Sequence, residues 1–205
     1  GRIGGSVIAQ AGQIKGVKIR NNLMIPPSVL GSEVLKGIGR YCQSVDSSIS
    51  SSHFDRLSIK GLNNEEIGAL VDGLVESARR VYSRMADVLD PFPCVHGVYV
   101  KEFINERTDL GFDYFLIDEC QDSDPLMIEF LKSQRSTQMI FAGDRNQSIN
   151  EWRGAKNIMK RLVTTNTAFL TQSFRFGQKI ADRANVILER LASPVLLKGN
   201  PALKS

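Results

Sequence analysis

Two adjacent carboxylates, Asp118 and Glu119, follow the apolar run 112–117. An acidic pair that leaves a buried strand can hold Mg²⁺ through one carboxylate and orient a water molecule with the other. A strand end that simply turns into solvent has the same composition. The pair therefore points to metal-assisted chemistry without establishing it.

Two further polar segments also follow apolar runs. The run 139–142 leads to Gln147, whose uncharged amide can sense a phosphate oxygen or a water through hydrogen bonds. The run 168–170 leads to Phe174 and Arg175. Arginine is a natural clamp for phosphate, and the aromatic ring beside it can stack on a purine. The alternative is that Arg175 pairs with a surface carboxylate and Phe174 fills the core.

The single tryptophan, Trp152, lies beside Arg153 in a polar segment rather than on an apolar stripe. Exposed aromatic side chains serve as stacking platforms for nucleic-acid bases. A buried tryptophan that anchors a core or a hinge is equally common. Both interpretations stay open at this point.

Helices are expected on either side of these segments. Asn63 and Glu66 form a capping pair, and apolar residues recur every three or four positions over 67–88, which predicts a long helix ending near Asp90. A second helix is predicted over 95–105. We expect one face of this helix to carry Val95, Val98, Tyr99 and Phe103. A third helix is expected to begin at Asp124 and Pro125, with Asp124 as its cap. A fourth is expected to bury the stripe Ile180, Ala184, Ile187, Leu188 and Leu191.

The short apolar runs alternate with these helices. This order is typical of an α/β fold, with a parallel sheet covered by helices on both faces. Ligands of such sheets bind at the carboxyl ends of the strands, so we expect the site just after Ile117, Ala142 and Leu170. Residues 1–57 are predicted to be irregular, with a flexible serine-rich loop at 47–52.

The amino-acid composition argues against several classes of protein. The 205 residues carry 26 basic and 22 acidic side chains, a formal charge of +4. No apolar run approaches the roughly 18 residues of a membrane span. Three scattered cysteines without a CxxC pair and only two histidines argue against disulfide, zinc and histidine-triad chemistry, and favour an intracellular protein. Basic residues dominate the first forty positions, either as a phosphate-facing surface or as a solvated face: Arg2, Lys15, Lys18, Arg20, Lys36 and Arg40.

Three segments in order carry a resemblance to a known family. Asp-Glu-Cys-Gln-Asp, then Gly-Asp-x-x-Gln-Ser-Ile-x-x-Trp-Arg-Gly-Ala, then Leu-Thr-Gln-Ser-Phe-Arg resemble successive motifs of UvrD/Rep/PcrA-type superfamily 1 DNA helicases. Gln-Ser-Phe-Arg-Phe-Gly is most similar to the F-box DNA helicase branch. The resemblance covers residues 110–192. It implies a partial RecA-like P-loop NTPase sheet over 107–205 and a mainly helical, 1B-like inserted subdomain with connecting segments over 1–106.

The resemblance also implies a role for each site residue. In the ATP site it implies Asp118 as the Mg²⁺ ligand, Glu119 as the residue that polarises the attacking water, Gln147 as the γ-phosphate sensor and Arg175 as the charge-neutralising group. Phe174 would stack on adenine, with Gln172 beside it as a further nucleotide contact. On the DNA side it implies three contacts: Trp152, Arg153 and, where many relatives carry an aromatic residue, Asn150.

The sequence contains no Gly-x-x-x-x-Gly-Lys-Ser/Thr loop to cradle phosphates. We therefore expect an internal fragment of an ATP-dependent helicase that moves 3′ to 5′ in DNA repair or recombination and is inactive alone. Its expected partners are single-stranded or partly duplex DNA and the missing P-loop segment and second motor domain, with no membrane. Three alternatives remain: a non-catalytic nucleic-acid-binding module with a degenerate helicase fold, another P-loop ATPase, and a nuclease built on Asp118, Glu119 and Asp122.

Overall fold

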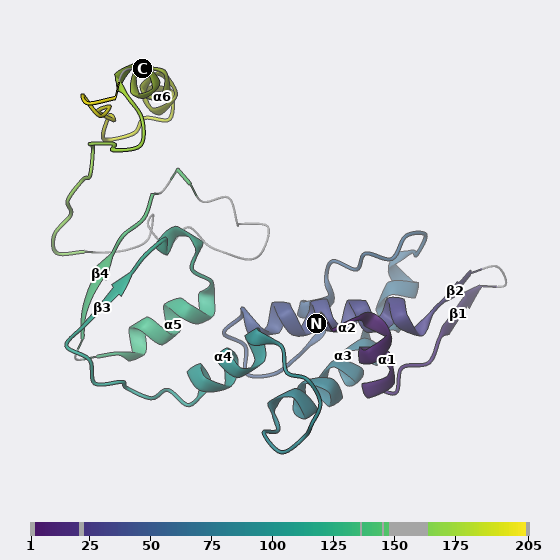
Figure 1. The fold of residues 1–205 in the computed structure, drawn as a ribbon. Helices are drawn as coiled ribbons and strands as arrows, with labels where there is room; N and C mark the ends of the chain where they lie inside the picture. Colours follow the sequence, from purple (N-terminus) through teal and green to yellow (C-terminus); the bar gives the residue numbers. More distant parts are fainter. Residues whose placement is uncertain (1–2, 21–22, 136, 145, 148–163, 204–205) are drawn as a thin grey trace. The chain divides into compact units, whose positions relative to one another are not determined.

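A computed structural model describes residues 3–20, 23–135, 137–144, 146–147 and 164–203 (Figure 1). The chain divides into two compact units, Gly1–Arg161 and Leu162–Ser205. Each unit is described by itself. None of the described helices is long and apolar enough to cross a membrane.

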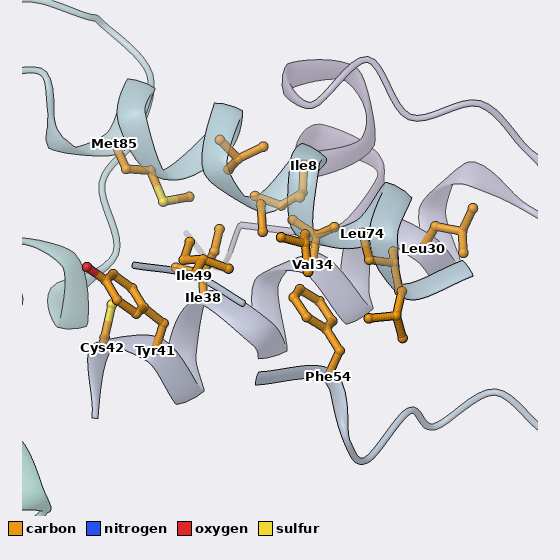
Figure 2. Packing of buried hydrophobic residues seen from close by; sticks show 14 of the residues in the cluster. Ile8, Leu30, Val34, Ile38, Tyr41, Cys42, Ile49, Phe54, Leu74 and Met85 are labelled. Atoms are coloured by element: carbon orange, nitrogen blue, oxygen red, sulfur yellow. The ribbon is translucent and has the colours of Figure 1, made fainter. Parts of the chain in front are cut away.

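The first part of the first unit is helical. It contains the helices α1 (Gly5–Ala11), α2 (Pro27–Cys42), α3 (Asn64–Ala86) and α4 (His96–Asn105). Between them lie the antiparallel pair β1 (Val17–Arg20) and β2 (Leu23–Ile25) and the 3-10 turn η1 (Ser51–Phe54). Figure 2 shows their shared core, in which side chains from α1, α2, α3 and the Ile49–Phe54 segment interdigitate. The prediction that residues 1–57 are irregular is wrong.

Glycine in α2 explains that error. The helix buries an apolar stripe that includes Leu30, Val34 and Ile38, but its interior glycines weaken the helical signal. These glycines serve packing: a Cβ at Gly31 would lie 2.0 Å from a backbone oxygen, and a Cβ at Gly37 would lie 2.3 Å from the Phe54 ring. The glycines of α2, whose composition is typical of a loop, therefore allow close packing of this helix.

The long helix α3 begins as predicted. The side chain of Asn63 accepts a hydrogen bond from the Glu66 backbone N–H, and Glu66 accepts one from the Asn63 N–H, both at 2.9 Å. The helix ends at Ala86, earlier than predicted. Beyond it, the carboxylates of Asp87 and Asp90 accept backbone N–H groups of the following residues, and such local bonds compete with helix continuation.

Helix α4 has the predicted bounds but not the predicted face. Val98 is buried as expected, whereas Tyr99 and Phe103 are exposed. A lysine takes their place in the interior: Lys101 is 1% exposed, and its ammonium donates to the carbonyl oxygens of Ser44 at 2.8 Å and Asp46 at 2.9 Å. Apolar periodicity missed it because a lysine can bury its long stem when its charge finds acceptors.

A small parallel sheet completes the unit. This region consists of strand β3 (Tyr114–Ile117), the 3-10 turn η2 (Cys120–Asp122), helix α5 (Pro125–Ser133) and strand β4 (Gln138–Phe141). The predicted cap is confirmed, since Asp124 accepts the Met127 N–H at 2.8 Å. The apolar side of α5 packs on the sheet in a second cluster that contains Ile104, Leu126, Phe130 and Leu131, with Ile117, Met139 and Phe141 against it.

The α/β character is thus confirmed in its coarse form, because β3 and β4 are parallel and joined through α5. Only one face of this pair is covered by described residues. Leu116 and Ile140 on the other face are 68% and 44% exposed. The expectation of helices on both faces is therefore not met in the part of the chain that the structure describes.

The second unit contains helix α6, Gln178–Arg190. The strand predicted over 168–170 is not formed; the nearest pairing is a single parallel bridge between Gln172 and Lys198. The predicted stripe of α6 is not buried either, since Ile187 is 60% exposed and only Ala181 is fully buried. The helical period is present, but the described residues of this unit, 164–203, form no second helix or sheet against which the stripe can pack.

Candidate functional site

The ends of β3 and β4 bring two of the predicted segments together. The strands pair in parallel with Ile117 opposite Phe141, so both polar segments leave the same edge. The Ala142 N–H donates to the Ile117 carbonyl at 2.8 Å, and the Cys120 N–H donates to the Ala142 carbonyl at 3.0 Å. The two polar segments therefore lie side by side at one edge of the sheet, as parallel pairing of the strands predicts.

Glu119 occupies a backbone conformation that is unfavourable for a non-glycine residue. Its φ is +48°, in the left-handed region, which costs about 1–2 kcal/mol. The Asp118 carboxylate stabilises the turn by accepting the Glu119 N–H at 2.9 Å. Both side chains are exposed. The sharp turn therefore presents two carboxylates to solvent at the strand end, and strained backbone of this kind is common at functional sites.

Behind the exposed pair lies Gln121, which sequence reasoning missed. Its side chain is buried, with 1% exposure. The Nε2 group donates to Glu119 Oε2 at 2.7 Å, and Oε1 accepts the Asp144 N–H at 3.1 Å. One amide thus joins the segment after β3 to the segment after β4. A long amide two residues after an exposed glutamate was the available signal.

The connection continues to Gln147 through Asp144, a second residue that was missed. Asp144 Oδ2 accepts the Gln147 side-chain N–H at 2.9 Å, and Oδ1 accepts the Asn146 N–H at 2.8 Å. The predicted water-polarising residue Glu119 and the predicted phosphate sensor Gln147 are therefore linked through the Gln121 side chain and through Asp144, whose backbone N–H meets Gln121 and whose carboxylate meets Gln147.

The donor set fits a magnesium ion that is shared with a nucleotide. Among the described residues there is no group of three or more His, Cys, Asp or Glu able to cage a metal. Mg²⁺ typically takes one or two carboxylates and completes its shell with water and substrate phosphates. The exposed carboxylate of Asp118 satisfies that requirement.

Cys120 sits between the carboxylates and the buried amide. It is fully buried, and burial raises the pKa of its thiol. A thiol held protonated is a poor nucleophile. The chemistry of this site therefore belongs to its carboxylates and amides.

In the second unit, the predicted phosphate clamp and stacking residue are accessible. Phe174 is 78% exposed, and Arg175 is exposed as well. Gln172 is less free, because its amide donates to the carbonyls of Gly199 at 2.7 Å and Ser173 at 3.0 Å. Its side-chain oxygen is the atom left for a nucleotide. The loop thus has a braced base and an exposed tip.

Close packing at Gly199 completes that brace. A Cβ there would lie 2.3 Å from the backbone nitrogen of Gln178, at the start of α6. The Gly199 N–H donates to the Gln178 side chain at 2.9 Å. Gly199, which accepts the Gln172 amide at the base of the loop, is therefore packed against the first turn of α6. The three predicted DNA contacts, Asn150, Trp152 and Arg153, lie outside the described residues.

The basic N-terminal region is already partly neutralised within the fold. Arg20 pairs with Glu66 at 2.6 Å, and Lys36 pairs with Glu33 at 2.7 Å. Arg40 donates to the backbone carbonyls of His53 and Arg56. Half of the six basic side chains are thus engaged, which weakens the interpretation of this region as a phosphate-facing surface.

Comparison with known proteins identifies the class to which this site belongs. Residues 86–165 match the UvrD/REP helicase N-terminal domain, a segment that contains β3, β4 and all four linked residues. The resemblance to UvrD-like helicases predicted from the motifs is confirmed: the chain carries a UvrD-like helicase segment.

Individual relatives carry helicase names. F-box DNA helicase protein 1 of Schizosaccharomyces pombe is 28% identical over 192 residues, covering 88% of this chain and 21% of that protein. F-box DNA helicase 1 of Gallus gallus is 33% identical over 56% of this chain and 12% of its own length. ATP-dependent DNA helicase PcrA of Leuconostoc citreum is 37% identical over 40% of this chain and 12% of its own length. The chain spans about a fifth or less of each relative.

Proposed function

We propose that this chain is part of an ATP-dependent DNA helicase or translocase that couples nucleotide hydrolysis to movement on single-stranded DNA. The observation that carries the proposal is the contact series from Glu119 through Gln121 and Asp144 to Gln147, at the ends of adjacent parallel strands. It lies inside the segment that matches the UvrD/REP helicase domain.

In this proposal the exposed acidic pair binds the metal ion and activates the attacking water. Asp118 holds Mg²⁺, which neutralises phosphate charge when bound. Glu119 accepts a proton from the attacking water through its exposed carboxylate. Gln147 hydrogen-bonds the γ-phosphate without adding charge. Because the Gln147 amide is bonded to the Asp144 carboxylate, a movement of Gln147 at the phosphate also changes this bond.

The second unit supplies the remaining nucleotide contacts. Arg175 neutralises charge that develops on the transferred phosphoryl group. Phe174 stacks on adenine, and its 78% exposure leaves the ring face open for that contact. The Gln172 side-chain oxygen is a further acceptor beside it.

DNA binding is assigned to the segment after Gln147. Trp152 stacks on a base, with Arg153 and Asn150 as polar contacts. The γ-phosphate sensor and the DNA contacts then belong to one stretch of chain, so ATP hydrolysis can change the contacts with the DNA strand. The substrate is single-stranded or partly duplex DNA, handled in repair or recombination inside a bacterial cell or a nucleus.

The organisation follows the same reasoning. We assign 1–106 to a helical, 1B-like inserted subdomain and 107–205 to the rear part of a first RecA-like motor domain. Two hydrophobic clusters meet near this boundary, since Val98 belongs to one and Ile104 to the other. No phosphate-binding loop occurs in the 205 residues, so we infer that these residues alone do not hydrolyse ATP and that a P-loop segment and a second motor domain complete the site.

A strand-displacement assay on the full-length protein tests the proposal. The substrates are a duplex with a 3′ single-stranded tail and the same duplex with a 5′ tail. We expect ATP-dependent displacement from the 3′-tailed substrate and little from the other. Displacement from neither substrate, together with no movement of a streptavidin block along single-stranded DNA, would contradict a motor function.

A further inference from the structure

The buried amide of Gln121 connects the two halves of the candidate site and carries an inference beyond the roles assigned above. Its two polar atoms are both used: Nε2 donates to Glu119 Oε2, and Oε1 accepts the Asp144 N–H. Because the side chain is only 1% exposed, water does not compete freely for either bond.

The bond to Glu119 has a chemical consequence. It engages Oε2 and leaves Oε1 of the same carboxylate as the basic atom for water. A donor at 2.7 Å also fixes the carboxylate plane, which the exposed side chain of Glu119 could not fix by packing. Correct orientation of a reacting group is worth large factors in rate, and an error of 1 Å can cost about 100-fold.

The bond to Asp144 extends this control to the second strand end. Asp144 in turn holds the Gln147 side chain at 2.9 Å. Gln147 thus contacts the Asp144 carboxylate and Gln121 contacts the Asp144 backbone N–H, so the link from Gln147 to Glu119 passes through the main chain at Asp144 and the side chain of Gln121.

We infer that Gln121 is a positioning residue that orients the Glu119 carboxylate and couples it to Gln147, so that water activation depends on the phosphate sensor. This inference rests on the proposed hydrolysis of ATP. Only a side chain with one donor and one acceptor at this length satisfies both contacts. Glutamate lacks the donor when ionised and brings a second negative charge to Glu119, whereas methionine fills the space without either bond.

The test compares three variants of the full-length protein: Gln121→Glu, Gln121→Met and the control Gln134→Glu. Gln134 is a matched control because it is also buried, at 3% exposure, and also bridges two segments. It accepts the Leu110 N–H at 2.9 Å and donates to the Thr108 carbonyl at 3.0 Å and to the Ser133 hydroxyl at 3.1 Å, so none of its partners belongs to the acidic pair.

The measurement is DNA-stimulated ATP hydrolysis across mildly acidic to mildly alkaline pH. For Gln121→Glu we expect kcat to fall about 10- to 100-fold at alkaline pH, with KM for ATP nearly unchanged. Activity relative to wild type should recover as the pH falls, because a protonated Glu at position 121 donates to Glu119 as the amide does. Gln121→Met should lose kcat without that recovery.

Two results would overturn the inference: wild-type kcat in both Gln121 variants, or a loss in Gln121→Glu that is the same at every pH and equals that of Gln134→Glu. Thermal unfolding of each variant separates misfolding from mispositioning. Gln121→Met decides the matter where Gln121→Glu does not fold. Failure of the proposed function is distinguishable, because Glu119→Gln would then leave hydrolysis unchanged, whereas failure of this inference leaves Glu119→Gln inactive and the Gln121 variants active.

Discussion

At the scale of single residues, the least expected side chains are polar ones in the interior. Lys101 and Gln121 are each 1% exposed, and each has its polar atoms bonded. Apolar periodicity cannot find such residues, because it counts them as solvent-facing. Asp118, Glu119 and Gln147 could be proposed from the sequence because their positions at strand ends carry the signal, whereas Gln121 and Asp144, which contact Glu119 and Gln147, could not.

The ion pair between Arg20 and Glu66 makes a residue-level prediction about pH. The Arg20 guanidinium, followed by the Asn63 backbone N–H, lowers the pKa of Glu66 from 4.5 to about 2. A carboxylate whose pKa is depressed by folding stabilises the folded state above its unfolded pKa. That contribution is lost as the pH falls from 4.5 towards 2.

We therefore expect Glu66→Gln to lower the melting temperature at neutral pH and to flatten its decline between pH 4.5 and 2. Thermal unfolding followed by circular dichroism measures both effects. The control is Glu65→Gln, an exposed acidic neighbour in the same first turn of α3. Parallel acid profiles for wild type and Glu66→Gln would show that the pair does not stabilise the fold.

At the scale of elements, strong periodicity was predictive and close packing was not. Helix α3, helix α5 and strands β3 and β4 were predicted because their apolar spacing and caps act locally. Helix α2 was missed because its glycines are placed for contacts with distant residues. The third strand was predicted wrongly, since an apolar run states that burial is needed but not that a pairing partner exists.

Helix α2 offers a matched pair of glycine substitutions. At Gly37 a Cβ would lie 2.3 Å from the buried Phe54 ring, whereas at Gly39 nothing lies within 4 Å. We expect Gly37→Ala to destabilise the first unit by about 1–3 kcal/mol through overpacking. Gly39→Ala should stabilise it by about 0.5–1 kcal/mol, because alanine favours helix.

Urea denaturation monitored by circular dichroism measures both changes. The two substitutions are chemically identical and lie in the same helix, so their difference isolates the contact with Phe54. Equal effects of the two substitutions would mean that the ring moves aside and that Gly37 is not required for packing.

At the scale of the whole molecule, the sequence predicted a UvrD-like segment, and the match over 86–165 confirms it. The meeting of the segments after β3 and β4 also followed from the parallel-sheet rule. The bond series through Gln121 and Asp144 was not predictable, because it depends on side-chain reach across two turns. Spacing along the chain carries no information about that distance.

The role proposed for Glu119, activation of water for ATP hydrolysis coupled to DNA, can be tested directly. The most direct measurement is the steady-state ATPase rate of the full-length protein, with and without single-stranded DNA, for wild type and Glu119→Gln. Glutamine keeps the size of the side chain but cannot accept the proton from water, so we predict a loss of about 100-fold or more in kcat with ATP binding retained. A Glu119→Gln protein that retains the DNA-stimulated rate of wild type would contradict the account.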